Sequence, residues 1–458
     1  MIYILTRILS AEQYGVYALG MASIGLIASV SFQWISVSVL RFYSVHLAKP
    51  DVLLAAATLL FIRVATAVIV ATVGFSLWQP IQAVTSMLAW AIGIGAIVMG
   101  WHSLSIQVAN ARGQPFRYGL LTVSRGALAL LVAVAFVKAG MGGVGAVFGF
   151  TLACLVSIFI FGIHRPTKVE LSSPKLRQQI IFYGLPMSLT YLATMVLDLS
   201  DRFMISWWLG PSAVAVYAAS YDLTQLSVGT ALNVFFLASY PHITTAWEAG
   251  GAPAARQAML PLARAMLLAT PVVVGIFVGM ASDISRFFLG AGLRADAVLV
   301  IQWVAVAIAI GCLKSFFLDI AFQLGKVTYV QLRITVLMGV LNVALNLTLI
   351  PKFGVLGAAM STAAAFSMGA VMSWWFGRRL RVYPLGMREL FSMVLSLLAI
   401  IFIVKSMPTI TDDGLFEASL RLIAGLTAFT VVALLTNLAG ARCVLLQKLR
   451  SILIRGVQ

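Results

Sequence analysis

Residues 52–77 read VLLAAATLLFIRVATAVIVATVGFSL, an apolar stretch interrupted by one charge, Arg63. About 20 residues of helix cross a hydrocarbon core of about 30 Å. No water is available there to bond backbone N–H and C=O groups, so the stretch is expected to form a helix, which satisfies those groups internally. The strands of a membrane β-barrel would alternate apolar and polar residues. The absence of such alternation predicts a helical membrane protein.

Twelve other apolar blocks of comparable length occupy most of the remaining chain. They lie at 14–39, 83–108, 117–137, 143–163, 180–208, 213–240, 259–281, 298–322, 329–350, 356–376, 389–407 and 418–438. Only 10% of the residues are charged, against about 25% in a soluble domain. A shorter apolar piece, Met1–Ile8, looks like the end of a further helix, so we expect an upstream in-frame start that adds about 20 apolar residues. The sequence thus predicts an all-α polytopic membrane protein with about 14 transmembrane helices, the first one truncated.

The net charge of +17 arises mainly from short basic connections between the blocks. With loops alternating between the two sides and the C-terminus inside, 20 Lys and Arg residues are cytoplasmic and 7 are outside. The cytoplasmic set is Arg41, Lys49, Arg112, Arg117, Arg165, Lys168, Lys175, Arg177, Arg256, Arg264, Lys326, Arg333, Arg378, Arg379, Arg381, Arg388, Arg442, Lys448, Arg450 and Arg455; the outside set is Arg7, Lys138, Arg286, Arg294, Lys352, Lys405 and Arg421. This bias follows the positive-inside rule. It places both termini in the cytoplasm and argues against nucleic-acid binding.

The chain also repeats itself. Residues 9–18 (LSAEQYGVYA) align with 209–218 (LGPSAVAVYA), and 138–143 (KAGMGG) align with 352–357 (KFGVLG). The repeat predicts a six-helix N-lobe at 1–163, a cytoplasmic linker at 164–179, a six-helix C-lobe at 180–377, and two extra helices with a basic cytoplasmic tail at 378–458. Parallel repeats of this kind are a recurring transporter plan with the substrate site between the halves.

Four short segments carry a resemblance to a known family. They are LTRILSAEQYG (residues 5–15), YGLP (183–186), SDRFMISWWLG (200–210) and FGVLGAA (353–359). These segments resemble the polysaccharide and O-antigen flippases of the multidrug/oligosaccharidyl-lipid/polysaccharide exporter superfamily. The resemblance implies two six-helix lobes around a cavity that opens alternately to each side. It also implies an undecaprenyl-diphosphate-linked oligosaccharide as cargo, moved from the cytoplasmic to the periplasmic leaflet of the bacterial inner membrane, for the synthesis of O-antigen, capsule or exopolysaccharide.

Other functions remain open at this point. A drug or cation antiporter and a peptidoglycan-precursor flippase belong to the same superfamily. A membrane polysaccharide polymerase or ligase has a similar number of helices but typically a long periplasmic loop, and the outside loops here are short. Cysteines and histidines show no metal-ligand spacing, and no catalytic set is visible. We expect no enzyme activity, metal or cofactor. The expected partners are the lipid-linked cargo, the membrane, H⁺ or Na⁺ as coupling ion, and polysaccharide polymerase and assembly proteins.

The first half carries arginines within its apolar blocks. A charge at mid-membrane costs about 2.5–3.5 kcal/mol on insertion scales, so such residues are functional candidates. Arg63 and Arg125 have no carboxylate in neighbouring blocks, and a guanidinium presents a planar fork to phosphate oxygens. We interpret both as ligands for the anionic cargo, with Arg41 at the cytoplasmic entrance. Snorkelling of these side chains to lipid headgroups is the alternative.

The second half carries carboxylates instead. Asp198, Asp201 and Arg202 are interpreted as a structural ion pair or as cavity residues, since Asp198 and Arg202 are four apart on a helix. Lys314 is placed in the same group. Asp222 and Asp319 are candidates for binding a coupling cation or for lining a cavity. Regular helical spacing puts Gln225 and Asn233 on one polar stripe with Asp222.

The charge bias yields the first test. Reporter fusions placed after Arg177 and at Gln458 should both indicate the cytoplasm, because basic loops are retained on that side. A periplasmic signal from either fusion would contradict the helix count.

Overall fold

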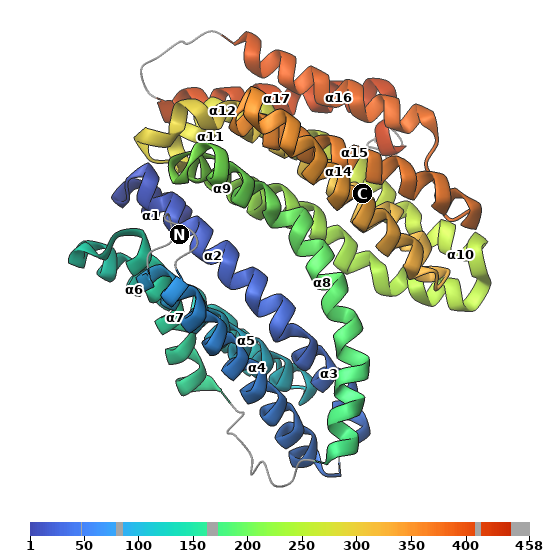
Figure 1. The fold of residues 1–458 in the computed structure, drawn as a ribbon. Helices are drawn as coiled ribbons and strands as arrows, with labels where there is room; N and C mark the ends of the chain where they lie inside the picture. Colours follow the sequence, from blue (N-terminus) through green and yellow to red (C-terminus); the bar gives the residue numbers. More distant parts are fainter. Residues whose placement is uncertain (47, 79–85, 163–172, 408–413, 441–458) are drawn as a thin grey trace, which may run out of the picture. The chain divides into compact units, whose positions relative to one another are not determined.

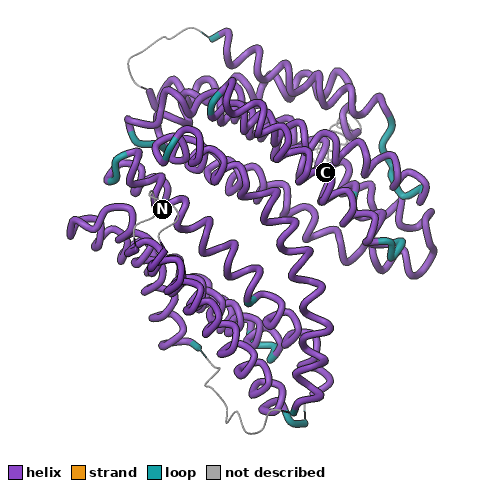
Figure 2. Tube along the Cα trace, in the orientation of Figure 1, coloured by secondary structure: helices purple, strands orange, loops and turns teal. Residues whose placement is uncertain are grey.

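The computed structural model describes the chain except for residues 47, 79–85, 163–172, 408–413 and 441–458 (Figure 1). The described part is helical and contains no strand (Figure 2). It forms two compact units, one spanning Tyr3–Ala215 and one that starts at Val216. Most of the expected linker and the whole basic tail lie outside the described residues. The division into lobes at 163, 179 and 377 stays a prediction.

The described residues of the first unit form eight α-helices. They are α1 (Ile2–Ile8), α2 (Ala11–Ser31), α3 (Gln33–Tyr43), α4 (Pro50–Trp78), α5 (Ser86–Ala111), α6 (Pro115–Phe136), α7 (Gly142–Phe161) and α8 (Pro174–Leu209). Ser10 begins α2 with a capping box: its hydroxyl accepts from the Gln13 amide at 3.2 Å, and the Gln13 side chain accepts from the Ser10 amide at 3.4 Å. Helix α7 approaches α2 so closely that a Cβ added at Gly143 would collide with the Gln13 carbonyl oxygen. Helix α8 packs on α2, α3 and α4 and therefore belongs with this unit.

The second unit contains longer and more irregular helices. They are α9 (Pro211–Thr224), which begins at the unit boundary, η4 (Gln225–Gly229), α10 (Thr230–Gly279), α11 (Ala281–Phe288), α12 (Arg294–Leu313), η6 (Lys314–Leu318), α13 (Ile320–Leu324), α14 (Thr328–Phe353), α15 (Val355–Gly377), α16 (Met387–Ser406) and α17 (Gly414–Thr436). Helix α15 packs against α12 and α14, while α16 and α17 pack against each other and against α10. Two small apolar clusters, one around Leu267 and one around Ile400, fix these last two helices on α10.

The helices confirm the predicted fold class. Ten described segments are long and apolar enough to cross a membrane. Two of them, Pro115–Phe161 and Pro211–Gly279, are broken by glycines with positive φ, Gly140 and Gly142 in the first and Gly251 in the second. When each of these two segments is counted as two and α8 is added, the ten segments correspond to the thirteen predicted apolar blocks. The sequence predicts a loop between the blocks at 213–240 and 259–281, whereas the structure continues in helix on both sides of Gly250 and Gly251.

Candidate functional site

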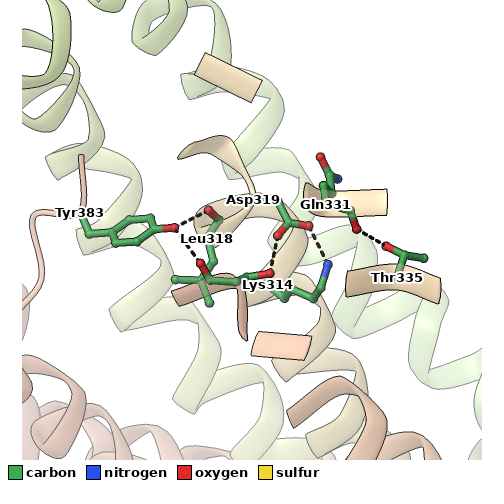
Figure 3. A network of polar contacts seen from close by, with 7 residues as sticks. Lys314, Leu318, Asp319, Gln331, Thr335 and Tyr383 are labelled. Atoms are coloured by element: carbon green, nitrogen blue, oxygen red, sulfur yellow. Dashed lines mark hydrogen bonds and ion pairs between the residues drawn. The ribbon is translucent and has the colours of Figure 1, made fainter. Parts of the chain in front are cut away.

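A buried ion pair closes a π-helical turn in the second unit (Figure 3). In η6 the amide of Asp319 donates to the carbonyl of Lys314, five residues earlier, at 2.8 Å. The Lys314 ammonium donates to Asp319 Oδ2 at 2.7 Å, and the two side chains are 5% and 1% exposed. Residues five apart point in different directions on a regular α-helix with 3.6 residues per turn. The wider π turn brings them together, and such turns are frequent at functional sites.

The second oxygen of the same carboxylate is bound from another helix. The Ser373 hydroxyl on α15 donates to Asp319 Oδ1 at 2.7 Å. Both oxygens of Asp319 therefore have a donor, and the residue is fully buried. A buried charge without such partners would be strongly destabilising. The ion pair is thus a complete polar cluster that joins η6 to α15.

Tyr383 completes the cluster from the connection between α15 and α16. Its hydroxyl donates to the Leu318 carbonyl at 2.6 Å (Figure 3). Its ring stacks on Phe317, with the two ring centroids 5.9 Å apart. In a regular α-helix the Phe322 amide would donate to the Leu318 carbonyl, four residues earlier. After the π turn it donates to the Asp319 carbonyl instead, at 3.1 Å. The Tyr383 hydroxyl thus supplies a donor to the Leu318 carbonyl, next to the irregular backbone hydrogen bond. Helix ends and breaks need such partners when they are buried.

Two further features keep the Tyr383 hydroxyl in this position. A Cβ added at Gly377 would collide with that hydroxyl, so the glycine permits the close approach. Burial raises the pKa of Tyr383, and the negative charge of Asp319 raises it further. A phenol is already protonated at neutral pH, and the raised pKa extends this to more alkaline pH, so the hydroxyl remains a hydrogen-bond donor.

A second polar chain links three helices of the same unit. The Tyr217 hydroxyl lies 3.3 Å from Thr362 Oγ1, and Asn342 Nδ2 donates to the same oxygen at 3.4 Å. Asn346 Nδ2 donates to Asn342 Oδ1 at 3.1 Å. These bonds connect α9, α14 and α15 as interhelical contacts of the kind that stabilises membrane bundles.

The candidate arginines of the first unit are accessible. Arg41 and Arg63 are exposed and Arg125 is half-buried. Among the described residues, none of the three forms an ion pair or a side-chain hydrogen bond. Arg125 lies close to His102 of α5 and to Cys154 of α7. An anion could therefore bind these guanidinium groups without displacing a carboxylate of the described part.

Arg125 also adjoins a buried polar group that sequence reasoning missed. His102 Nε2 lies 3.2 Å from the Leu121 carbonyl and 3.5 Å from the Ser157 hydroxyl. That hydroxyl lies 2.8 Å from the Ser124 hydroxyl, which precedes Arg125 on α6. The group joins α5, α6 and α7. A lone histidine within an apolar block gave no signal of these contacts.

The remaining predicted residues fall in different places. On α8, Asp201 and Arg202 are buried and Asp198 is half-buried. In the second unit, Asp222 is half-buried. The π turn η4 (Gln225–Gly229) follows directly and changes the helical phase. Asp222, Gln225 and Asn233 are therefore not related by the regular helical spacing that the sequence predicts. Gln225 is exposed, whereas Asn233 is half-buried.

Two solved structures share this fold. The lipid II flippase MurJ in an inward closed conformation matches with a TM-score of 0.75 and 12% sequence identity, over 95% of each chain. An inward-facing multidrug resistance MATE family transporter of the MOP superfamily matches with a TM-score of 0.69 and 16% identity, over 83% of this chain and 94% of that one. The fold therefore defines a multi-pass membrane protein with the architecture of MOP superfamily transporters.

The sequence identifies the family within that class. The profile of the polysaccharide biosynthesis protein family matches residues 1–247, more than half of the chain, and the chain belongs to this family. A curated relative, the probable flippase AglR of Haloferax volcanii, is 27% identical over 258 residues. The matched region is 54% of this chain and spans about half of that relative, 52% of its length.

The hydrogen bond from Tyr383 to the Leu318 carbonyl can be tested by removing the Tyr383 hydroxyl. Tyr383→Phe should lower the free energy of unfolding by about 0.5–1.5 kcal/mol, because the half-buried Leu318 carbonyl loses the hydrogen bond from Tyr383. Thermal or denaturant unfolding of the purified protein in detergent measures the change. Tyr329→Phe is the matched control, since Tyr329 is 57% exposed. Equal free energies of unfolding in the two variants would contradict a stabilising role for the Tyr383 hydroxyl.

Proposed function

We propose that the chain is a flippase that moves an undecaprenyl-diphosphate-linked oligosaccharide from the cytoplasmic to the periplasmic leaflet by alternating access. The observation that carries the proposal is the family match over residues 1–247. It covers a first unit in which the guanidinium groups of Arg63 and Arg125 have no ion-pair partner among the described residues. The name of the curated relative supports a flippase.

The proposal assigns cargo binding to the first unit. Arg63 and Arg125 would hold the diphosphate, because guanidinium groups bind phosphate oxygens through paired, charge-assisted hydrogen bonds. Arg41 would attract the anionic head to the cytoplasmic entrance. Each arginine lacks an ion pair with the rest of the described chain, so cargo would supply the compensating charge only while it is bound.

The coupling ion is assigned to the second unit. We propose that a proton or a sodium ion binds at Asp222. Asp319 was the other candidate from the sequence, but Lys314 already balances its charge in this structure. Coupling requires that cargo and ion each favour one conformation over the other.

The cellular setting follows from the same proposal. The protein would lie in the plasma membrane of a bacterium with both termini in the cytoplasm and would change no covalent bond in its cargo. A polymerase and assembly proteins of a polysaccharide pathway would receive the flipped oligosaccharide.

A peptidoglycan precursor is the second candidate cargo. The match to MurJ over 95% of the chain favours it, and a lipid-linked precursor with a diphosphate would suit the same arginines. Export of a drug cation is favoured less, since three guanidinium groups would repel it.

Charge removal in the first unit tests the proposal. Hydrogen bonds to charged groups contribute about 1.5–3 kcal/mol. Arg63→Ala and Arg125→Ala should therefore each weaken binding of an undecaprenyl-diphosphate oligosaccharide by about 10-fold or more. Lysine at either position should restore binding only in part, because it lacks the planar fork. Titration of the purified protein in the absence of an ion gradient measures these affinities.

Arg333→Ala is the matched control, because Arg333 is an exposed arginine of α14 in the second unit. Its affinity should equal that of the unaltered protein. Unchanged affinity in both first-unit variants would contradict the assignment of cargo to these arginines. A parallel titration with a peptidoglycan precursor decides between the two cargoes.

A further inference from the structure

The end of α15 carries two exposed tryptophans that are followed by three exposed arginines. Trp374 is 44% exposed and Trp375 is 49% exposed, and both lie near the end of Val355–Leu380, a segment long and apolar enough to cross a membrane. Arg378, Arg379 and Arg381 come after them and are exposed as well. Tryptophan rings are enriched at the level of the lipid headgroups. These five residues form a Trp–Arg patch at the expected edge of the hydrocarbon.

The tryptophans contact one of the arginines directly. The guanidinium carbon of Arg378 lies 3.7 Å from the centroid of the Trp375 ring and 5.2 Å from the centroid of the Trp374 ring. A cation–π contact uses the flat face of a guanidinium, whereas its N–H donors point outward in the plane of the group. The contact therefore leaves the planar fork of Arg378 available for phosphate oxygens.

Buried neighbours fix the backbone that carries the other two arginines. The Leu380 side chain packs so near Gly325 that a Cβ added to this glycine would lie 3.0 Å from it, and Val382 is fully buried. Between these two anchors, Arg381 has a left-handed conformation with a φ of 54°, which is uncommon for a residue other than glycine. Exposed arginines thus alternate with anchored apolar side chains, so the protein holds the positive charges at its surface.

The charges of the patch are not balanced within the described part of the chain. Among the described residues, Arg378, Arg379 and Arg381 form no ion pair. The nearest carboxylate along the sequence, Glu389, accepts a hydrogen bond from the Gly386 amide at 3.0 Å at the start of α16. An anion from the surroundings can therefore bind the patch without displacing a carboxylate of the described residues.

We propose that the Trp–Arg patch binds the phosphate group of an anionic phospholipid, such as phosphatidylglycerol. The tryptophans place the site at the depth of the headgroups, and the arginines supply charge-assisted donors. A soluble anion would make no use of two exposed tryptophans at the end of an apolar helix. The charge bias of the loops predicts that this end of α15 faces the cytoplasm, where the leaflet carries anionic lipids. The inference concerns the second unit alone and involves no cargo.

The experiment measures which lipid lies next to the two tryptophans. The full chain is reconstituted into vesicles of phosphatidylcholine and phosphatidylglycerol, and one of the two lipids carries brominated acyl chains that quench tryptophan fluorescence. Comparison of each protein with its Trp374→Phe/Trp375→Phe version isolates the quenching at the patch. A basic residue near an anionic membrane surface favours association by about fivefold. We therefore expect a preference for phosphatidylglycerol of about fivefold or more.

Substitution of the arginines should remove this preference. Arg378→Gln/Arg379→Gln/Arg381→Gln keeps polar side chains of similar length but leaves no charged donor at the patch. Arg378→Lys keeps the charge and should retain the preference only in part, because lysine lacks the planar fork. Should the triple variant fail to fold, Arg379→Gln alone carries the test and should lower the preference by about fivefold.

Arg256→Gln/Arg264→Gln/Arg333→Gln is the matched control. It removes the same charge from three exposed positions elsewhere in the second unit. The preference at the patch should be the same as in the unaltered protein, because the control leaves the Trp–Arg patch intact.

Three results would overturn the inference. Equal quenching by the two brominated lipids in the unaltered protein would leave the patch to another occupant, such as an acidic protein. A preference that persists in the folded triple variant would place the lipid-binding charges elsewhere. An equal loss in the triple variant and in the matched control would attribute the preference to net charge alone. None of these results bears on the cargo, which the titrations of the arginine variants of the first unit test separately.

Discussion

Hydrocarbon offers no hydrogen-bond partner to a backbone group and little stabilisation to a charge, and this constraint explains most of the described chain. It accounts for the helices, whose backbone bonds are internal. It also explains why polar side chains bond the irregular turn and the buried charge described here. The π turn at Lys314–Leu318 shifts one step of the ladder, and the Tyr383 hydroxyl bonds the adjacent Leu318 carbonyl. The buried Asp319 carboxylate is matched by an ammonium and a hydroxyl. Charges that the chain does not balance internally then stand out as candidates for binding.

The two units meet this constraint in different ways. In the second unit the Lys314–Asp319 pair and the pairing of Arg421 with Asp283, at 3.0 Å, neutralise charge within the protein. In the first unit, Arg63 and Arg125 have no ion-pair partner in the part of the chain that the structure describes. An anionic cargo would complete the charge balance of the first unit only while it is bound. Under the proposed function, the second unit would instead keep the Lys314–Asp319 pair throughout the cycle and bind its coupling ion at Asp222.

The fold could be predicted because the length and composition of apolar blocks are sufficient to indicate membrane helices. The breaks at Gly140, Gly142 and Gly251 fall between blocks that the sequence already separated. The cluster around Asp319 could not be predicted in the same way. Sequence reasoning assumed a regular helical period, under which Lys314 and Asp319 do not face each other, whereas the π turn pairs them. Ser373 joins from 54 residues beyond Asp319 and Tyr383 from 65 residues beyond Leu318, and neither residue type marks a site by itself. A second π turn after Asp222 likewise interrupts the predicted polar stripe.

The central claim is that the first unit binds the diphosphate of a lipid-linked cargo. An experimental structure of the full chain in complex with undecaprenyl diphosphate tests it most directly, because this molecule carries the lipid and the anionic group without the sugar. The account predicts phosphate oxygens within hydrogen-bond distance of the guanidinium groups of Arg63 and Arg125, with the Lys314–Asp319 pair intact. A diphosphate bound only to residues of the second unit, with both arginines directed at lipid headgroups, would contradict it.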